Sequence, residues 1–163
     1  MEHRIGLGID RHRLVPGRRL VLGGVEIPHD RGLDGHSDAD ALIHAVCDAM
    51  LGAAALGDIG QLFSDSDPAH AGRDSTEFLV AVVQRLRRAG YTPVNVDATL
   101  MAEAPKLAPH VLAMRERMAG LIGLDTDHVS VKATRGEGMG PEGREEGITV
   151  HAVVLVRTAE APA

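Results

Sequence analysis

Apolar residues recur along this chain with two different periods, which predict strands and helices in a mixed order. Alternation of apolar and polar residues with period two, bounded by glycine, proline and charged residues, predicts strands. The predicted strands cover residues 4–12, part of 18–28, 93–103, 129–134 and 148–157. The last of these is the most hydrophobic, which is typical of a strand at the centre of a sheet.

Helical periodicity fills most of the chain between these strands. One helix is predicted over residues 38–56. A second begins at Asp74 and ends before Gly90, and a third follows the turn at 104–106 and ends before Gly123. A strand, a helix and a strand near the C-terminus form one βαβ crossover, which implies a parallel strand pair.

These elements predict a single domain of the α/β class, of the α+β type, in which a mixed β-sheet packs on helices. Their order is β-β-α-α-β-α-β-β, with residues 29–35 and 135–147 as loops. We expect the domain to span residues 1–157 and a flexible tail to follow over 158–163.

Composition and charge narrow the choice of partners. Of 163 residues, 44% are hydrophobic and 25% charged, which is typical of a globular protein. A net charge of −6 and only 2% aromatic residues argue against a nucleic-acid partner, which needs basic surface or stacking rings. No segment resembles a signal peptide or a membrane span, and the single Cys47 fits a reducing compartment. We therefore expect a cytoplasmic protein without a membrane partner.

The stretch over residues 36–44 combines a helix start with a histidine. Ser37 is predicted to be the N-cap, with Asp40 completing a capping box. His44 follows within an apolar helix, on a polar stripe that it shares with Asp40 and Asp48. Two interpretations stay open for His44, a core histidine bonded to a carbonyl group or a functional ligand.

Asp10 and His12 place a carboxylate and an imidazole on one face of the first strand, about 7 Å apart in rise. Gly6 and Gly8 precede them on that face, and strand glycines often mark the close approach of another group. With His44, these side chains match the two-histidine, one-carboxylate ligand set of many catalytic zinc sites. A salt bridge at the strand end is the alternative.

Two loops and a helix start carry polar residues suited to anions or metals. Backbone amides at His36 and Ser37 favour an anion, although an ordinary cap has the same pattern. Asp58 and Asp65 suit hydroxyl groups or a metal, or are simply solvated.

The turn after residue 132 is rich in charge. Lys132 and Arg135 suit phosphate, and Glu137 suits a hard cation such as Mg²⁺. A surface hairpin with self-paired charges has the same composition.

Long motifs resemble a known family. They are GIDRH, GGVEIP, GHSDADALIHAVCDAMLGAAALGDIGQLF, DSDP, NVDATLMAEAPK, VSVKAT and GREEGI. Together they run almost end to end and are similar to those of the 2-C-methyl-D-erythritol 2,4-cyclodiphosphate synthase family of the non-mevalonate isoprenoid pathway.

The resemblance implies a homotrimer with active sites between subunits, each with one Zn²⁺ held by Asp10, His12 and His44. It implies a lyase reaction in which the 2-phosphate of 4-diphosphocytidyl-2-C-methyl-D-erythritol 2-phosphate attacks the β-phosphate and CMP leaves. Glu137 would hold Mg²⁺ or Mn²⁺ that bridges the substrate diphosphate.

The resemblance also implies roles for substrate-contacting residues. His36 and Ser37 would position the attacking phosphate. The methylerythritol part would contact Asp58, Ile59 and Gly60, with Phe63 and Asp65 close by. The cytidine pocket of the adjoining subunit would be formed by Ala102, Pro105, Lys106, Ala108, Ala133 and Thr134.

Two positions depart from the family pattern. Arg135 and Gly136 stand where the family has polar residues of a threonine-rich turn, and the guanidinium of Arg135 is expected to replace a threonine at the transferring phosphate. Pro141 replaces a phenylalanine near the trimer axis, while Arg144 is retained, so that an isoprenoid diphosphate could still bind in an axial cavity.

Two other functions are compatible with these residues. A zinc-dependent hydrolase of another nucleotide or ester would use the same ligands, and Arg135 favours it. The other is a non-catalytic trimeric protein that binds isoprenoid diphosphates or nucleotides. The intact set of Asp10, His12, His44 and Glu137 argues against it.

Overall fold

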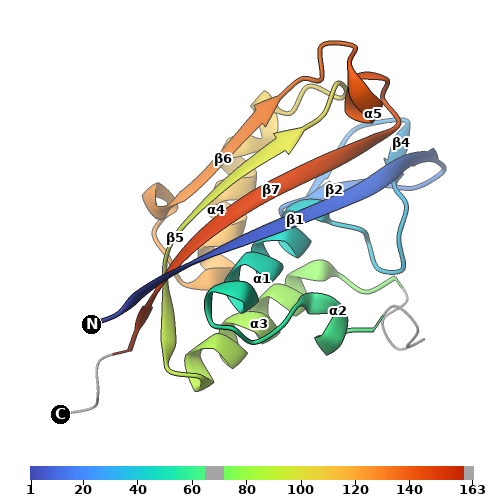
Figure 1. The fold of residues 1–163 in the computed structure, drawn as a ribbon. Coiled ribbons are helices and arrows are strands. Elements are labelled where there is room, and N and C mark those ends of the chain that lie inside the picture. Colours follow the sequence, from blue (N-terminus) through green and yellow to red (C-terminus); the bar gives the residue numbers. More distant parts are fainter. Residues whose placement is uncertain (65–71, 160–163) are drawn as a thin grey trace.

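A five-stranded mixed sheet forms one layer of the molecule, and the helices cover one of its faces (Figure 1). The computed structural model describes residues 1–64 and 72–159. The strands lie in the order β4-β1-β7-β5-β6. Their bounds are Arg31–Leu33 (β4), His3–Pro16 (β1), Gly147–Thr158 (β7), Tyr91–Met101 (β5) and Val129–Thr134 (β6).

Strand β7 lies at the centre of this sheet, as its hydrophobicity predicts. It pairs antiparallel with β1 on one side and with β5 on the other. Strands β5 and β6 pair in parallel and are joined through helix α4, Val111–Ile122, which confirms the predicted crossover. The prediction of an α+β domain with a mixed sheet packed on helices is thus confirmed.

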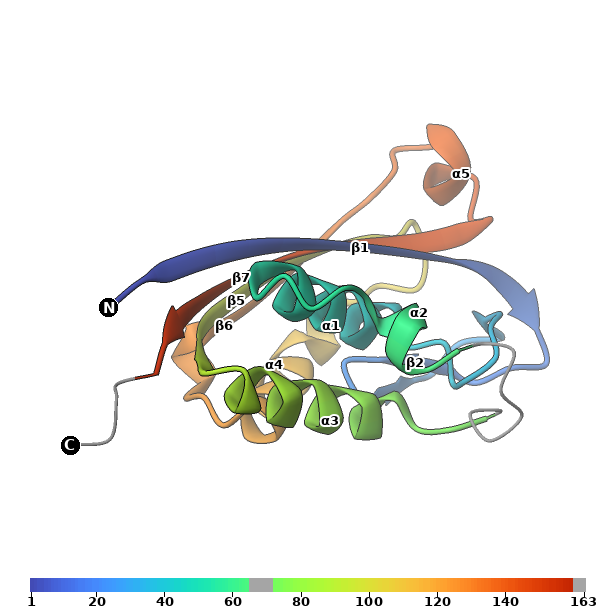
Figure 2. The ribbon, with the colours of Figure 1, turned by 60° about the horizontal axis from the view of Figure 1, so that its bottom comes forward.

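Helix α1, Ala41–Ala53, lies directly beneath β1 and β7, and helix α3, Ser75–Arg88, packs on its far side (Figure 2). Gly6 and Gly8 make the first contact possible. A Cβ atom at Gly6 would lie 1.8 Å from the carbonyl oxygen of Ala49, and one at Gly8 would lie 1.9 Å from that of Ala45. The strand backbone therefore touches the helix backbone, as the glycines predict.

The opposite face of β1 is apolar and open to solvent in the single chain. Ile5, Leu7 and Ile9 are 70%, 59% and 52% exposed, and Val153 of β7 is exposed beside them. Alternation places these side chains away from α1, because the glycines between them face it. A contiguous apolar surface of this kind marks an interaction site.

The predicted start of α1 is wrong. Ser37 does not cap it; Asp40 is the N-cap and accepts a hydrogen bond from the Ile43 amide at 3.0 Å. The same buried carboxylate accepts from the amides of Gly23 and Gly24 at 2.9 and 2.7 Å. Burial raises the pKa of Asp40 to about 6 against these hydrogen bonds. Sequence spacing misses this cap because two of its three donors come from a distant hairpin.

The predicted element order is incomplete. The segment over 18–28 is a hairpin of β2, Leu20–Leu22, and β3, Val25–Ile27. Residues 29–35, expected to be a loop, contain β4. Single-turn helices lie in other expected loops or next to longer helices. These are α2 (Ile59–Leu62), η2 (Ala108–His110), η3 (Thr126–His128) and α5 (Gly140–Gly143). Such short elements carry too few residues to show a period.

The C-terminal strand extends into the predicted tail. Thr158 still belongs to β7, and the amide of Ala159 donates to the Gly90 carbonyl at 2.7 Å. The rest of the tail, 160–163, lies outside the described residues. Within the described part of the chain, no helix combines the length and apolar character needed to cross a membrane.

We expect Gly8→Ala to destabilise the protein by about 1–3 kcal/mol, because the new methyl group pushes α1 off the sheet. Urea unfolding measures this change. The matched control is Gly52→Ala in helix α1, where a Cβ atom meets nothing within 4 Å. That variant is expected to gain about 0.5–1 kcal/mol from reduced backbone entropy. Equal effects of the two substitutions would contradict the close packing.

Candidate metal and substrate site

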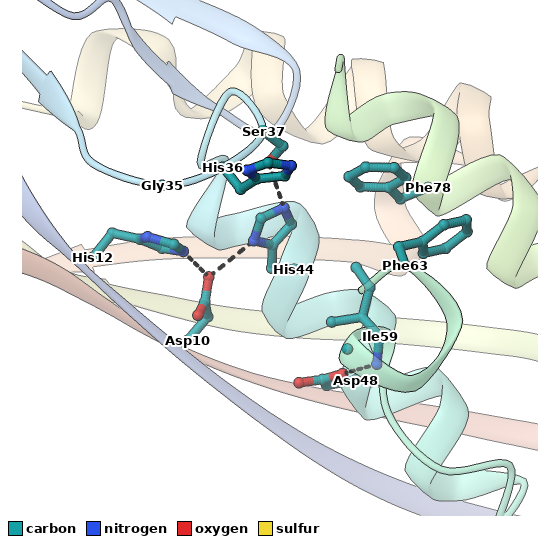
Figure 3. Close-up of a pocket in the computed structure, with 11 residues that line it drawn as sticks. Asp10, His12, Gly35, His36, Ser37, His44, Asp48, Ile59, Phe63 and Phe78 are labelled. Atoms are coloured by element: carbon teal, nitrogen blue, oxygen red, sulfur yellow. Dashed lines mark hydrogen bonds and ion pairs between the residues drawn. The ribbon is translucent and has the colours of Figure 1, made fainter. Parts of the chain in front are cut away.

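A cavity of about 180 Å³ opens where β1, α1, α2 and α3 meet beside the loop before α1 (Figure 3). Its lining brings together residues from five parts of the chain. They are Asp10, His12, Gly35, His36, Ser37, His44, Asp48, Ile59, Gly60, Phe63 and Phe78. Most side chains predicted to bind metal, phosphate and the methylerythritol part therefore share one cavity.

Asp10, His12 and His44 converge in this cavity. Asp10 Oδ2 lies 2.9 Å from His12 Nε2 and 3.2 Å from His44 Nδ1. One ligand atom from each residue lies within 4.8 Å of the others, the spacing at which a single ion can be shared. The close packing of α1 on the glycines of β1 creates this meeting, which the sequence left open.

A hydrogen bond to a backbone carbonyl group decides which ring nitrogen of His12 carries the hydrogen. His12 Nδ1 lies 2.6 Å from the carbonyl oxygen of Asp34. A carbonyl oxygen only accepts, so Nδ1 carries the hydrogen, and in the neutral ring Nε2 presents its lone pair to Asp10. Asp10 Oδ2 is itself buried without a hydrogen-bond donor among the described residues. A cation between these two acceptors satisfies both, whether it is a metal ion or the second proton of the imidazole ring.

The carboxyl group of Asp10 is ionised at neutral pH. Burial opposes its ionisation, but the contacts with His12 and His44 outweigh burial and hold the pKa of Asp10 well below its ordinary value. A carboxylate with two imidazoles is a donor set typical of zinc with an open fourth position. The residues present therefore fit a zinc ion.

On the side of the cavity formed by α2, two carboxylates accept hydrogen bonds from backbone amides. Asp48 Oδ1 accepts from the Ile59 amide at 2.7 Å and so ties α1 to α2. Asp58 caps α2 by accepting from the Gln61 amide at 2.9 Å and does not line the cavity, unlike Ile59 and Gly60. The predicted contact of Asp58 with substrate thus remains a prediction.

Two aromatic rings close another wall of the cavity. Phe63 stacks on Phe78 with ring centroids 4.5 Å apart, and the ring of His44 lies 6.3 Å from that of Phe78. Phe78 was not predicted as a site residue, because a phenylalanine on the apolar stripe of a helix has no local signal. Asp65 lies outside the described residues.

A second cavity, of about 330 Å³, opens at the C-terminal ends of the parallel strands β5 and β6. It shares no lining residue with the first cavity. Its lining contains the whole predicted cytidine set together with three further residues. It consists of Ala102, Glu103, Pro105, Lys106, Leu107, Ala108, Ala133, Thr134 and Arg135.

Glu103, which the sequence did not single out, holds Arg135 at this cavity. Its Oε1 accepts from Arg135 Nε at 3.1 Å and from Nη2 at 2.5 Å. The hydrogen bond with Arg135 lowers the pKa of Glu103. Lys132 instead pairs with Asp97 on the neighbouring strand.

The remaining predicted residues are not part of the lining of either cavity in the single chain. Gly136, Glu137, Pro141 and Arg144 line neither of them. Glu137 has a left-handed backbone with φ of 52°, and Arg144 pairs with Glu146 at 2.6 Å.

The fold and the first cavity define an α+β protein with a metal-type site of two histidines and one aspartate. A sequence profile of the YgbB family matches residues 3–157. A relative from Syntrophomonas wolfei, named 2-C-methyl-D-erythritol 2,4-cyclodiphosphate synthase, is 56% identical over 156 residues, covering 96% of this chain and 99% of that protein. The chain therefore belongs to the YgbB family.

Solved structures agree with this assignment. A 2C-methyl-D-erythritol-2,4-cyclodiphosphate synthase in a form bound to CDP is 38% identical, with a TM-score of 0.87 over 94% of this chain and 100% of that one. The bifunctional IspDF of Campylobacter jejuni is 39% identical, with a TM-score of 0.94 over 98% of this chain. This chain spans 43% of that longer protein.

We expect His44→Ala to lose bound zinc while keeping its fold, because two donors rarely hold zinc as tightly as three. Metal analysis of the purified variant beside the parent, with circular dichroism for the fold, measures this. The control is His128→Ala, which removes a histidine from the exposed group Asp125, Asp127 and His128. Zinc retained in His44→Ala would contradict the site.

Proposed function

We propose that this protein converts 4-diphosphocytidyl-2-C-methyl-D-erythritol 2-phosphate into 2-C-methyl-D-erythritol 2,4-cyclodiphosphate and CMP, a phosphorus–oxygen lyase step of the non-mevalonate isoprenoid pathway. The observation that carries the proposal is the convergence of Asp10, His12 and His44 in one cavity of a YgbB-family chain. We place the protein in the cytoplasm, without a nucleic-acid or membrane partner.

The reaction is an intramolecular phosphoryl transfer. An oxygen of the 2-phosphate forms a bond to the β-phosphorus, the bond from that phosphorus to the bridging oxygen breaks, and CMP leaves with that oxygen. Such a step needs positioning and neutralisation of charge more than a strong base. Zn²⁺ held by Asp10, His12 and His44, with Mg²⁺ or Mn²⁺ at Glu137, supplies this neutralisation when bound.

The loop before α1 positions the attacking phosphate. Arg18 donates to the carbonyl oxygens of Gly35 and Ser37 at 2.8 and 2.7 Å, which supports a rigid backbone around His36. The amides and side chains of His36 and Ser37 then hold the phosphate, with His36 as a catalytic group. Ile59 and Gly60, with Asp58, Phe63 and Asp65, hold the methylerythritol part.

The second cavity takes the cytidine. Ala102, Pro105, Ala108 and Ala133 offer small or apolar walls, and the remaining lining includes Lys106 and Thr134. Arg135 acts at its edge as the cationic group beside the transferring phosphate, and Gly136 contacts the substrate next to it.

The protein acts as a homotrimer whose sites combine cavities of neighbouring subunits. Two observations support this assembly. The two cavities of one chain share no lining residue, and the face that carries Ile5, Leu7 and Ile9 is apolar and exposed. Pro141 and Arg144 then lie near the axis, where an isoprenoid diphosphate could bind.

Incubating the zinc-loaded protein with this substrate and Mg²⁺ is expected to release CMP together with a cyclic diphosphate, detected by chromatography and phosphorus NMR. Release of CMP with a linear phosphate would favour a zinc-dependent hydrolase. Tight binding without turnover would favour a binding protein. Either outcome would overturn the proposal.

We expect Arg135→Ala to lower kcat by about 10²-fold, the scale for losing one donor to developing charge. Steady-state CMP release measures it. The control, Arg88→Ala, removes an exposed arginine at the end of α3 and leaves kcat unchanged. An unchanged kcat in Arg135→Ala would contradict a catalytic role for Arg135.

A further inference from the structure

The second ring nitrogen of His44 reaches a buried hydroxyl group on another helix. His44 Nε2 lies 2.9 Å from Ser75 Oγ, and Ser75 is the first residue of α3. The Ser75 hydroxyl also hydrogen-bonds to Asp38 Oδ1, and the Ser75 amide donates to Asp38 Oδ2 at 3.1 Å. Ser75 is fully buried, so water does not compete for these bonds.

The direction of each hydrogen bond follows from the donors available. The carboxylate of Asp38 only accepts, and the hydroxyl of Ser75 has a single hydrogen to give. That hydrogen goes to Asp38, so Ser75 Oγ accepts from His44 Nε2. The hydrogen on Nε2 leaves Nδ1 of the neutral ring with its lone pair, and Nδ1 is the atom that lies 3.2 Å from Asp10 Oδ2.

We propose that Asp38 and Ser75 are positioning residues that hold His44 in the ring orientation and tautomer required of a metal ligand. The inference rests on the zinc site of the proposed function. The partner of a ligating imidazole raises its basicity and fixes its orientation, and losing such a partner typically weakens metal binding. Asp38 and Ser75 do this here from the loop before α1 and from α3.

Helix capping does not explain this arrangement. Helix α3 already has Asp74 as its N-cap, whose side chain accepts from the Thr76 amide at 2.8 Å. Ser37 Oγ lies farther from His44 Nε2, at 3.4 Å, and bonds to the Ala39 amide at 3.2 Å (Figure 3). Ser75 is therefore the principal hydrogen-bond partner of His44 Nε2.

The two histidines are held by different means. His12 is oriented by the backbone carbonyl of Asp34, which no side-chain substitution removes. His44 depends on two side chains, so its half of the metal site can be altered without touching a ligand. This difference makes the inference testable.

The test is the zinc dissociation constant of metal-stripped protein, measured by competition with a chromophoric chelator. Ser75→Ala is expected to weaken zinc binding about 10- to 100-fold. Ser75→Thr keeps the hydroxyl and is expected to restore most of this loss. The control, Thr76→Val, removes the adjacent hydroxyl of α3 and is expected to leave the constant unchanged.

Asp38→Asn provides a second variant of nearly the same shape, should Ser75→Ala fail to fold. Its amide NH₂ can turn the Ser75 hydroxyl toward His44 and impose the wrong tautomer. We expect weaker zinc binding and an altered visible absorption spectrum of the Co²⁺-substituted protein. An unchanged zinc constant in Ser75→Ala, or in Asp38→Asn if only that variant folds, would overturn the inference.

The zinc measurement separates this inference from the proposed function. A parent protein that binds zinc but releases no CMP would contradict the proposed function, and the variants would still decide the inference. If the parent releases CMP and Ser75→Ala binds zinc as the parent does, the inference alone fails.

Discussion

The contact between the backbones of β1 and α1 is the constraint on which the site depends. Gly6 and Gly8 carry no Cβ, so the helix lies against the strand at a distance that any side chain would forbid. The next residues on the same strand face are Asp10 and His12, and the first turn of the helix carries His44. The packing that closes the core therefore also brings the three ligand-type side chains together.

One buried and one half-buried carboxylate keep the elements around this contact in place. Asp40 joins the β2–β3 hairpin to α1 by accepting from the amides of Gly23, Gly24 and Ile43. Asp48 ties α1 to α2. Each accepts hydrogen bonds from amides, which offsets part of the cost of burying a carboxyl group. Asp40 and Asp48 on the polar stripe of α1 therefore have structural roles. His44 is the residue of that stripe that contacts Asp10 in the metal-type site.

The separate positions of the two cavities on one chain bear on how copies of the chain would assemble. One chain carries a metal-type cavity near α1 and a separate cavity at the ends of β5 and β6. A substrate with a nucleotide at one end and a phosphate at the other needs both kinds of cavity. In the proposed trimer, the exposed apolar face of β1 and β7 is the surface on which copies of the chain would meet.

The sequence by itself determined the long elements, the central place of β7, the parallel crossover and the ligand-type residues, because periodicity, glycines and residue chemistry are local. It missed Asp40 as the cap, and it gave no signal for Ser75, Phe78 or Glu103. Their partners lie on other elements, so only the tertiary structure decided their contacts. It also decided that His44 meets Asp10 rather than a carbonyl group, because that distance depends on how closely α1 packs on β1.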